Sequence, residues 1–182
     1  MYNIHLILKK KIVLIGYAGV GKSSVGEVLA DIFRIPFIDL DNEIVKFENK
    51  SIDKIFKNKG ELYFRKIEYE CLIKILNTSD SNIISLGGGT PCYYNTIEVL
   101  NSNDVVHTVF LKASINILTE RLFNERRSRP IIKYLKDKKS LSEFIGKHLF
   151  ERNLYYNKSN YIINTDNKSI DQIANLIKNK LT

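Results

Sequence analysis

A glycine-rich segment directly after an apolar run constrains the fold of this chain more than any other feature. The segment reads Gly16-Tyr17-Ala18-Gly19-Val20-Gly21-Lys22-Ser23, and the apolar run before it extends from Lys11 to Ile15. It satisfies the pattern G-x-x-x-x-G-K-[S/T], which would arise by chance in roughly one chain in two hundred of this composition. Such a loop joins a strand to a helix, and its backbone N–H groups surround phosphate groups. The sequence therefore predicts a nucleoside-triphosphate site on an α/β fold.

Two residues of this loop have distinct expected roles. Lys22 would add positive charge at the phosphates, and Ser23 would offer its hydroxyl to Mg²⁺. The motif alone leaves open a kinase, a GTPase, an ATPase motor or a silent regulator, although the chain has no N-K-x-D segment for guanine recognition. The predicted nucleotide contacts in the loop are Gly19, Val20, Gly21, Lys22, Ser23 and Ser24.

Short β-branched runs alternate with helix-length amphipathic stretches along the whole chain. This alternation predicts an α/β domain with a parallel five-stranded sheet flanked by helices, and ligands bind beyond the carboxyl ends of such strands. No repeat or domain boundary is visible, so we expect a single domain over residues 1–182. The predicted strands are Lys11 to Ile15, Pro36 to Asp39, Asn82 to Leu86, Val105 to Leu111 and Tyr161 to Ile163.

Composition limits the partners and the compartment. The net charge is +8, but it is spread along the chain and no basic stripe alternates with aromatic residues, so we expect no nucleic-acid partner. Cys71 and Cys92 form no C-x-x-C or Cys/His cluster, which argues against a zinc site and favours the cytoplasm. No secretory signal or membrane span is predicted.

Two aspartates follow the second predicted strand. In Phe37-Ile38-Asp39-Leu40-Asp41, period-two geometry would send both carboxylates to one side at the ligand end of the sheet. The functional interpretation gives Asp39 to the metal and Asp41 to a substrate hydroxyl. The alternative is that Asp41 caps a helix that begins near Asn42.

Two further segments lie after strands or within predicted helices. Gly60 opens a helix that carries Glu61, Arg65 and Glu68 on one face, for which an exposed ion-pair ladder is the alternative. The triplet Gly87-Gly88-Gly89 follows the third strand, where backbone can approach a ligand closely; a flexible turn is the alternative.

The arginines near the C-terminal half suggest recognition of anions. Residues 124–139 form a long polar connection, for which a mobile lid is the hypothesis and a disordered insertion the alternative. Its cluster Arg126-Arg127-Ser128-Arg129 suits a transferring phosphoryl group, although solvated charge is the usual explanation of such clusters. Arg152 shares a predicted inward face with apolar residues and needs a partner, which a carboxylate substrate would supply. That face carries Leu141, Ile145, Leu149, Arg152 and Tyr156.

In order along the chain, these motifs resemble the shikimate kinase family. The resemblance extends from about Lys11 to Ile163 and includes Asp39-Leu40-Asp41, Gly60-Glu61 with Phe64-Arg65, the triple glycine, Arg129-Pro130 and Arg152 to Tyr156. It implies a three-layer P-loop kinase fold and ATP-dependent phosphorylation of the 3-hydroxyl of shikimate, a step of aromatic amino-acid (chorismate) biosynthesis. We expect a cytoplasmic monomer with shikimate, ATP and Mg²⁺ as its small-molecule partners.

The resemblance also implies roles for individual residues. Lys22, Asp41 and Arg129 would be catalytic, Ser23 and Asp39 would serve Mg²⁺, and a helical segment at about 41–70 would bind substrate. Arg121 would lie on the adenine, Arg129 would reach the transferred phosphate, and Phe56 with Phe64 would line the pocket. The shikimate-binding set would be Asp41, Arg65, Gly87, Gly88, Gly89 and Arg152.

The chain departs from the family pattern in a few places. The proline usual after Arg152 is replaced within Asn153-Leu154-Tyr155-Tyr156, Ile131 stands where leucine is common, and residues 164–168 lack the proline often placed against adenine. The ten residues before Lys11 are additional. Two rival functions remain at this point: a kinase for another polyol acid such as gluconate, and a non-catalytic nucleotide-sensing module.

Overall fold

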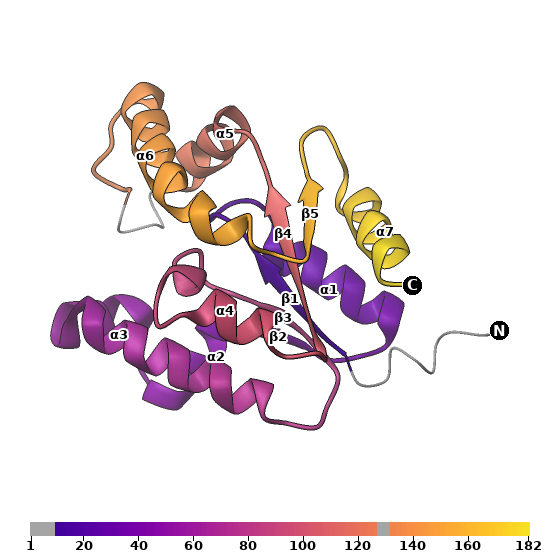
Figure 1. Ribbon diagram of the computed structural model, residues 1–182. Coiled ribbons are helices and arrows are strands. Elements are labelled where there is room, and N and C mark those ends of the chain that lie inside the picture. The colour runs from indigo at the N-terminus through magenta and orange to yellow at the C-terminus, as the bar shows by residue number, and fades with distance from the viewer. Residues whose placement is uncertain (1–9, 127–131) are drawn as a thin grey trace.

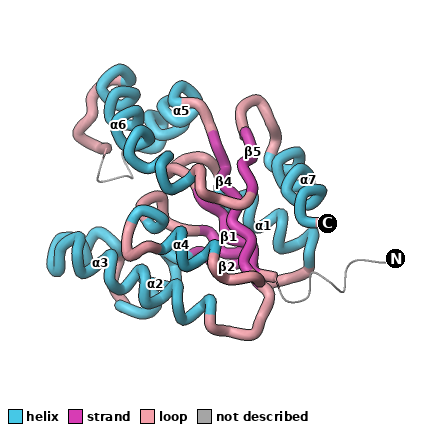
Figure 2. The backbone as a smooth tube through the Cα atoms, in the orientation of Figure 1, coloured by secondary structure: helices cyan, strands magenta, loops and turns pink. Residues whose placement is uncertain are grey.

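The computed structural model describes residues 10–126 and 132–182. Five parallel strands form one sheet in the order β2-β3-β1-β4-β5 (Figures 1 and 2). The predicted strands are confirmed to within one residue at each end. The strands are β1 (Lys11–Ile15), β2 (Phe37–Asp39), β3 (Asn82–Ser85), β4 (Val106–Lys112) and β5 (Tyr161–Asn164).

Helices cover the sheet and extend past its carboxyl edge. Helices α1 (Lys22–Phe33) and α7 (Ile170–Leu181) pack side by side on one face, and α4 (Thr96–Asn101) packs against β4 from the other (Figures 1 and 2). Helices α5 (Ile115–Glu125) and α6 (Lys138–Tyr156) pack together beyond the arrowhead of β4. The predicted three-layer α/β fold is therefore confirmed.

The central strand explains why the sheet must be covered on both faces. Every residue of β1 is buried, including both ends of the apolar run. A strand buried on both faces reads as a continuous apolar segment, which is what the sequence shows. In the part of the chain that the structure describes, no helix is long and apolar enough to cross a membrane.

Two consecutive helices, α2 (Leu40–Glu48) and α3 (Ile52–Leu76), follow β2. They contain the segment predicted to bind the acceptor substrate, which is called the acceptor side below. The backbone of Gly60 breaks α3 with φ 80° and ψ 174°, a conformation open to glycine and strained for other residues. The second half of α3 thus begins after Gly60, as the sequence predicted. Near it, a short 3₁₀ helix, η2 (Thr90–Cys92), follows the triple glycine.

The hypothesised lid, residues 124–139, lies partly outside the described structure. Residues 127–131, which include Arg129, are not described, so the lid stays a prediction. Asn124 and Glu125 belong to α5, whereas Lys138 and Lys139 begin α6, so both ends of the predicted 124–139 connection are helical.

Candidate active site

The phosphate loop connects β1 to α1 at the carboxyl edge of the sheet. Gly21 caps α1 in a left-handed conformation, with φ 100°, and so provides no side-chain hydrogen bond to the amino end of the helix. Lys22 Nζ donates to the carbonyl oxygens of Gly16 at 2.9 Å and of Tyr17 at 3.2 Å. The lysine is therefore folded over its own loop, where backbone N–H groups and a helix N-terminus favour an anion.

A hydroxyl and a carboxylate meet beside this loop. Ser23 Oγ donates a hydrogen bond of 3.0 Å to Asp39 Oδ2, so two oxygen ligands lie next to the phosphate site. Mg²⁺ usually takes only one or two protein ligands together with water and phosphate oxygens, and this pair fits that preference. Among residues 10–126 and 132–182, no three His, Cys, Asp or Glu side chains form a metal-binding group.

The prediction that strand geometry aligns Asp39 with Asp41 is wrong. Helix α2 already begins at Leu40, so Asp41 lies in its first turn and not on an extended strand. The alternative that Asp41 is the cap is also wrong, because Asp39 Oδ1 accepts from the backbone nitrogens of Asp41 (3.1 Å) and Asn42 (3.4 Å). The cap frees the side chain of Asp41 from a structural role at the helix end.

Asp41 is half-buried among charged groups of both signs. Burial, the largest cause, and the carboxylates of Asp39 and Glu68 together raise its pKa to about 6, whereas Lys22 and Arg65 act in the opposite direction. A carboxylate with a pKa close to neutrality suits general-base chemistry. Lys22 of the phosphate loop and Arg65 of α3 therefore both lie close enough to Asp41 to act on its charge.

Arg65 is held by two glutamates of its own helix. Its Nη1 donates to Glu68 Oε2 at 2.7 Å, and this pair is buried, with the Glu68 side chain only 2% exposed. Glu61 Oε1 lies 3.4 Å from both Nε and Nη2, and its side chain is half exposed. The predicted shared face is confirmed, but an exposed ladder is not, because its central pair lies inside the protein.

The triple glycine lets these acceptor-side groups approach the backbone. A Cβ on Gly89 would lie 2.6 Å from Arg65 Nη2, and a Cβ on Gly87 would lie 2.8 Å from a Glu68 carboxylate oxygen. At Gly88 a Cβ would lie 3.3 Å from the nitrogen of Ala18 and 3.5 Å from Arg152 Nη1. The flexible-turn alternative does not fit, because each glycine is packed against a functional group.

Arg152 reaches the same point from α6. Leu141, Ile145, Leu149 and Tyr156 are buried as predicted, and Arg152 continues their face as a half-buried residue. The hydroxyl of Tyr156 donates to the carbonyl of Gly88 and fixes the end of α6 to the triplet. Phe64 and Phe56 stack nearby on the acceptor side, with ring centroids 4.5 Å apart, and the Arg65 guanidinium lies 5.1 Å from the Phe64 ring.

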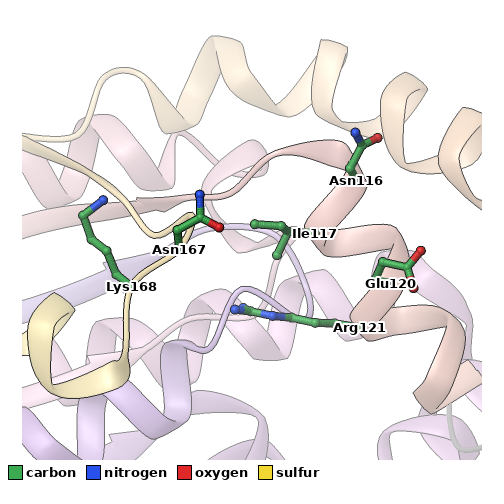
Figure 3. A pocket seen from close by; sticks show the side chains of 6 residues that line it. All are labelled: Asn116, Ile117, Glu120, Arg121, Asn167 and Lys168. Atoms are coloured by element: carbon green, nitrogen blue, oxygen red, sulfur yellow. The ribbon is translucent and has the colours of Figure 1, made fainter.

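A separate cavity of about 420 Å³ lies between α5 and the turn after β5 (Figure 3). Arg121 points under Ile117 toward Asn167, and its Nη1 donates to the carbonyl oxygens of Gly19 and Val20 at 3.2 Å each. The cavity therefore adjoins the phosphate loop and has room for a planar base. Its lining residues are Asn116, Ile117, Glu120, Arg121, Asn167 and Lys168.

Comparison with known proteins decides which kinase family carries this geometry. The shikimate kinase family model matches residues 18–182. The shikimate kinase of Flavobacterium johnsoniae is 47% identical over 163 residues, which cover 90% of this chain and 94% of that protein. The chain belongs to the shikimate kinase family.

Solved structures of shikimate kinases share the fold. The crystal structure of the enzyme from Bacteroides thetaiotaomicron is 32% identical, with a TM-score of 0.85, and covers 94% of this chain and 98% of its own. The enzyme from Acinetobacter baumannii, solved in complex with shikimate, also has a TM-score of 0.85; at 24% identity it supports the fold alone. The chain is thus a phosphotransferase of the shikimate kinase family, an ATP-dependent kinase family, and the two rival functions are set aside.

Sequence reasoning missed several residues of this shikimate kinase site. Thr90 Oγ1 donates to Glu68 Oε1 at 2.6 Å, and Tyr93 Oη donates to Glu61 Oε1 at 3.0 Å, so η2 and the residue after it fix both glutamates around Arg65. The Arg65 guanidinium also lies 4.5 Å from the Tyr93 ring. The one sequence feature that could have indicated Thr90 and Tyr93 is their position shortly after the triple glycine. The phosphate-loop pattern leaves the position of Tyr17 variable and so gives no signal for it.

Proposed function

We propose that this chain transfers the γ-phosphoryl group of ATP to the 3-hydroxyl of shikimate, with Lys22 and Asp41 as catalytic residues. The observation that supports this most strongly is the meeting at Gly88 of the phosphate loop and Arg152, beside Asp41 and Arg65. A phosphate donor and a carboxylated acceptor bound at these groups would lie in one continuous site. Phosphoryl transfer requires mainly such positioning and charge neutralisation.

The acceptor carboxylate would bind between two guanidiniums. Arg65 already donates from Nη1 to the buried Glu68, whereas its Nε and Nη2 make long contacts of 3.4 Å to Glu61. A substrate carboxylate can therefore replace Glu61 on this edge while Glu68 keeps the arginine in place. Arg152 would hold the same carboxylate from α6.

Asp41 would accept the proton of the attacking hydroxyl. Its pKa of about 6 leaves it ionised at neutral pH and still basic enough to take a proton. The hydroxyl oxygen forms the new bond to the γ-phosphorus, the bond from that phosphorus to the β–γ bridging oxygen breaks, and the proton moves to Asp41. ADP is the leaving group.

Lys22 would turn from its own loop to the phosphates. Its ammonium donates to the carbonyls of Gly16 and Tyr17, and phosphate oxygens would compete for it as stronger, charged acceptors. Ser23 and Asp39 would hold Mg²⁺, which when bound neutralises phosphate charge. Arg121, with Asn167 and Lys168 opposite it, would enclose the adenine in the cavity beside α5 (Figure 3).

A coupled assay of ADP release tests the proposal. We expect rapid turnover with shikimate and Mg²⁺-ATP, and background rates with gluconate, quinate or no acceptor. Lys22→Ala should lower kcat by several orders of magnitude without changing the thermal unfolding temperature. Turnover of gluconate at a rate comparable with shikimate, or a Lys22→Ala rate near the wild-type value, would contradict the proposal.

A further inference from the structure

Tyr17 belongs to the phosphate loop, but its side chain packs against α6. The ring is buried, with 5% of the residue exposed. Its hydroxyl lies 3.0 Å from Nδ1 of His148, and the guanidinium carbon of Arg152 lies 5.3 Å from the ring centroid. This one side chain therefore contacts two residues of the helix that carries the carboxylate-binding arginine.

The backbone of the same residue contacts the phosphate lysine. The carbonyl oxygen of Tyr17 accepts a hydrogen bond of 3.2 Å from Lys22 Nζ. One residue thus joins the two halves of the site, because its main chain meets the donor side and its ring meets the acceptor side. The other loop residues between Gly16 and Gly21 carry only small or aliphatic side chains, which cannot reach a guanidinium in this way.

The hydrogen bond to His148 fixes the orientation of the ring. Burial raises the pKa of Tyr17 to about 12, so the phenol keeps its proton and can donate it. Burial and the charge of Arg152 lower the pKa of His148, which favours the neutral imidazole, and Nδ1 accepts from the phenol when the ring proton is on Nε2. His148 is itself held by Phe144, with ring centroids 4.2 Å apart.

The two carboxylate-binding arginines are held in different ways. Arg65 forms a buried ion pair with Glu68. Arg152, in the part of the chain that the structure describes, forms no ion pair with a carboxylate and lies instead over the face of Tyr17. An aromatic face attracts a cation without neutralising it, so Arg152 retains its full charge for an incoming anion.

We propose that Tyr17 is a positioning residue that presents the Arg152 guanidinium to the carboxylate of the acceptor. The inference rests on the proposed role of Arg152 in binding shikimate. The phosphate-loop pattern leaves position 17 variable, yet in this chain the residue there would determine the affinity for the acceptor. The ring supplies the electrostatic attraction, and the hydroxyl supplies the orientation through His148.

Steady-state kinetics of ring-deleting and ring-preserving variants test this role. Tyr17→Leu removes the ring, and we expect the KM for shikimate to rise about tenfold, the scale of a partly desolvated cation–π contact, while the KM for ATP stays within about twofold. Tyr17→Phe keeps the ring and should restore the KM for shikimate to within about threefold of wild type. Tyr155→Leu is the matched control, because its ring on α6 faces Lys158 at 5.7 Å and not Arg152, and it should change neither KM.

A double-mutant cycle separates positioning from loop structure. In an Arg152→Gln background, Tyr17→Leu should raise the KM for shikimate by less than about twofold further, because the residue it positions is gone. Additive effects in the cycle, or an equal rise in both KM values for Tyr17→Leu, would overturn the inference. If Arg152→Gln alone leaves the KM for shikimate unchanged, the proposed carboxylate role fails as well; if only the Tyr17 variants are silent, the inference alone fails.

A replacement that preserves shape covers the case in which Tyr17→Leu does not fold. Pentafluorophenylalanine at position 17 keeps the volume of phenylalanine but reverses the charge on the ring face. Relative to Tyr17→Phe, it should raise the KM for shikimate about three- to tenfold. Equal KM values for these two proteins would contradict an electrostatic role for the ring.

Discussion

Asp41 illustrates how a single residue can gain function at the expense of stability. Its folded pKa of about 6 exceeds its ordinary value of 3.8, so folding favours the protonated form. The associated stabilisation is present below about pH 4 and is lost as the pH rises through 6. Asp41→Asn should therefore increase the free energy of unfolding at pH 8 by roughly 1–3 kcal/mol, with no gain near pH 4. Urea unfolding at the two pH values measures this; an equal effect at both would contradict it.

The same substitution tests catalysis. Asparagine cannot take the hydroxyl proton, so kcat should fall about 10²–10⁴-fold in Asp41→Asn. In the wild-type enzyme, kcat/KM should decline below about pH 6, where Asp41 becomes protonated. If the residual activity of Asp41→Asn keeps that acid limb, another group is responsible for it. A change confined to the KM for ATP would contradict the assigned role.

Arg65 can be tested with its charge preserved. Arg65→Lys keeps a cation for the buried Glu68 but loses the planar fork, so shikimate binding should weaken by roughly 1.5–3 kcal/mol while ATP binding barely changes. Calorimetry with shikimate and its neutral amide provides the comparison, since the amide should lose little more in the variant. Arg34→Lys, at the exposed end of α1, is the control and should alter neither ligand. Equal losses for acid and amide would mean that Arg65 does not hold the carboxylate.

At the scale of elements, α3 depends on the backbone of Gly60. The space around a Cβ there is open, yet φ 80° with ψ 174° strains any other residue, so Gly60→Ala should cost roughly 1–3 kcal/mol. Gly146→Ala in the interior of α6 is the matched control. Its Cβ would lie 3.7 Å from Ile115 Cδ1, an ordinary contact, so it should add about 0.5–1 kcal/mol.

Thermal unfolding measures both effects: we expect a lower melting temperature for Gly60→Ala and a higher one for Gly146→Ala than for the wild type. We also expect a higher KM for shikimate in Gly60→Ala, because the break sets the direction of the half-helix that carries Arg65. An unchanged or higher melting temperature for Gly60→Ala would show that α3 can continue through this position without a break.

At the scale of the whole molecule, we expect a monomer. A net charge of +8 opposes self-association. Sedimentation at physiological salt should show a single species near 21.1 kDa over a wide range of protein concentration. A concentration-dependent species of twice that mass would contradict this expectation.

The sequence alone was enough for the sheet and the phosphate loop. Strand positions and the loop before α1 depend on local patterns, namely β-branched runs and glycines at fixed spacing, which neighbouring residues determine. The shared face of Glu61, Arg65 and Glu68 was predictable for the same reason, since helix periodicity relates residues a few positions apart. The catalytic role of Arg129 and the lid remain predictions.

The tertiary structure decided how these pieces meet. Asp39, and not Asp41, caps α2 because the helix begins at Leu40, two residues earlier than a strand continuing to Asp41 would allow. Burial of the Arg65–Glu68 pair depends on Thr90 and the triple glycine, which lie beyond the end of α3 and after β3 in the sequence. The packing of Tyr17 against His148 joins residues 131 positions apart. Such contacts depend on which surfaces the folded layers bring together, and that placement is a property of the whole chain, which no local pattern encodes.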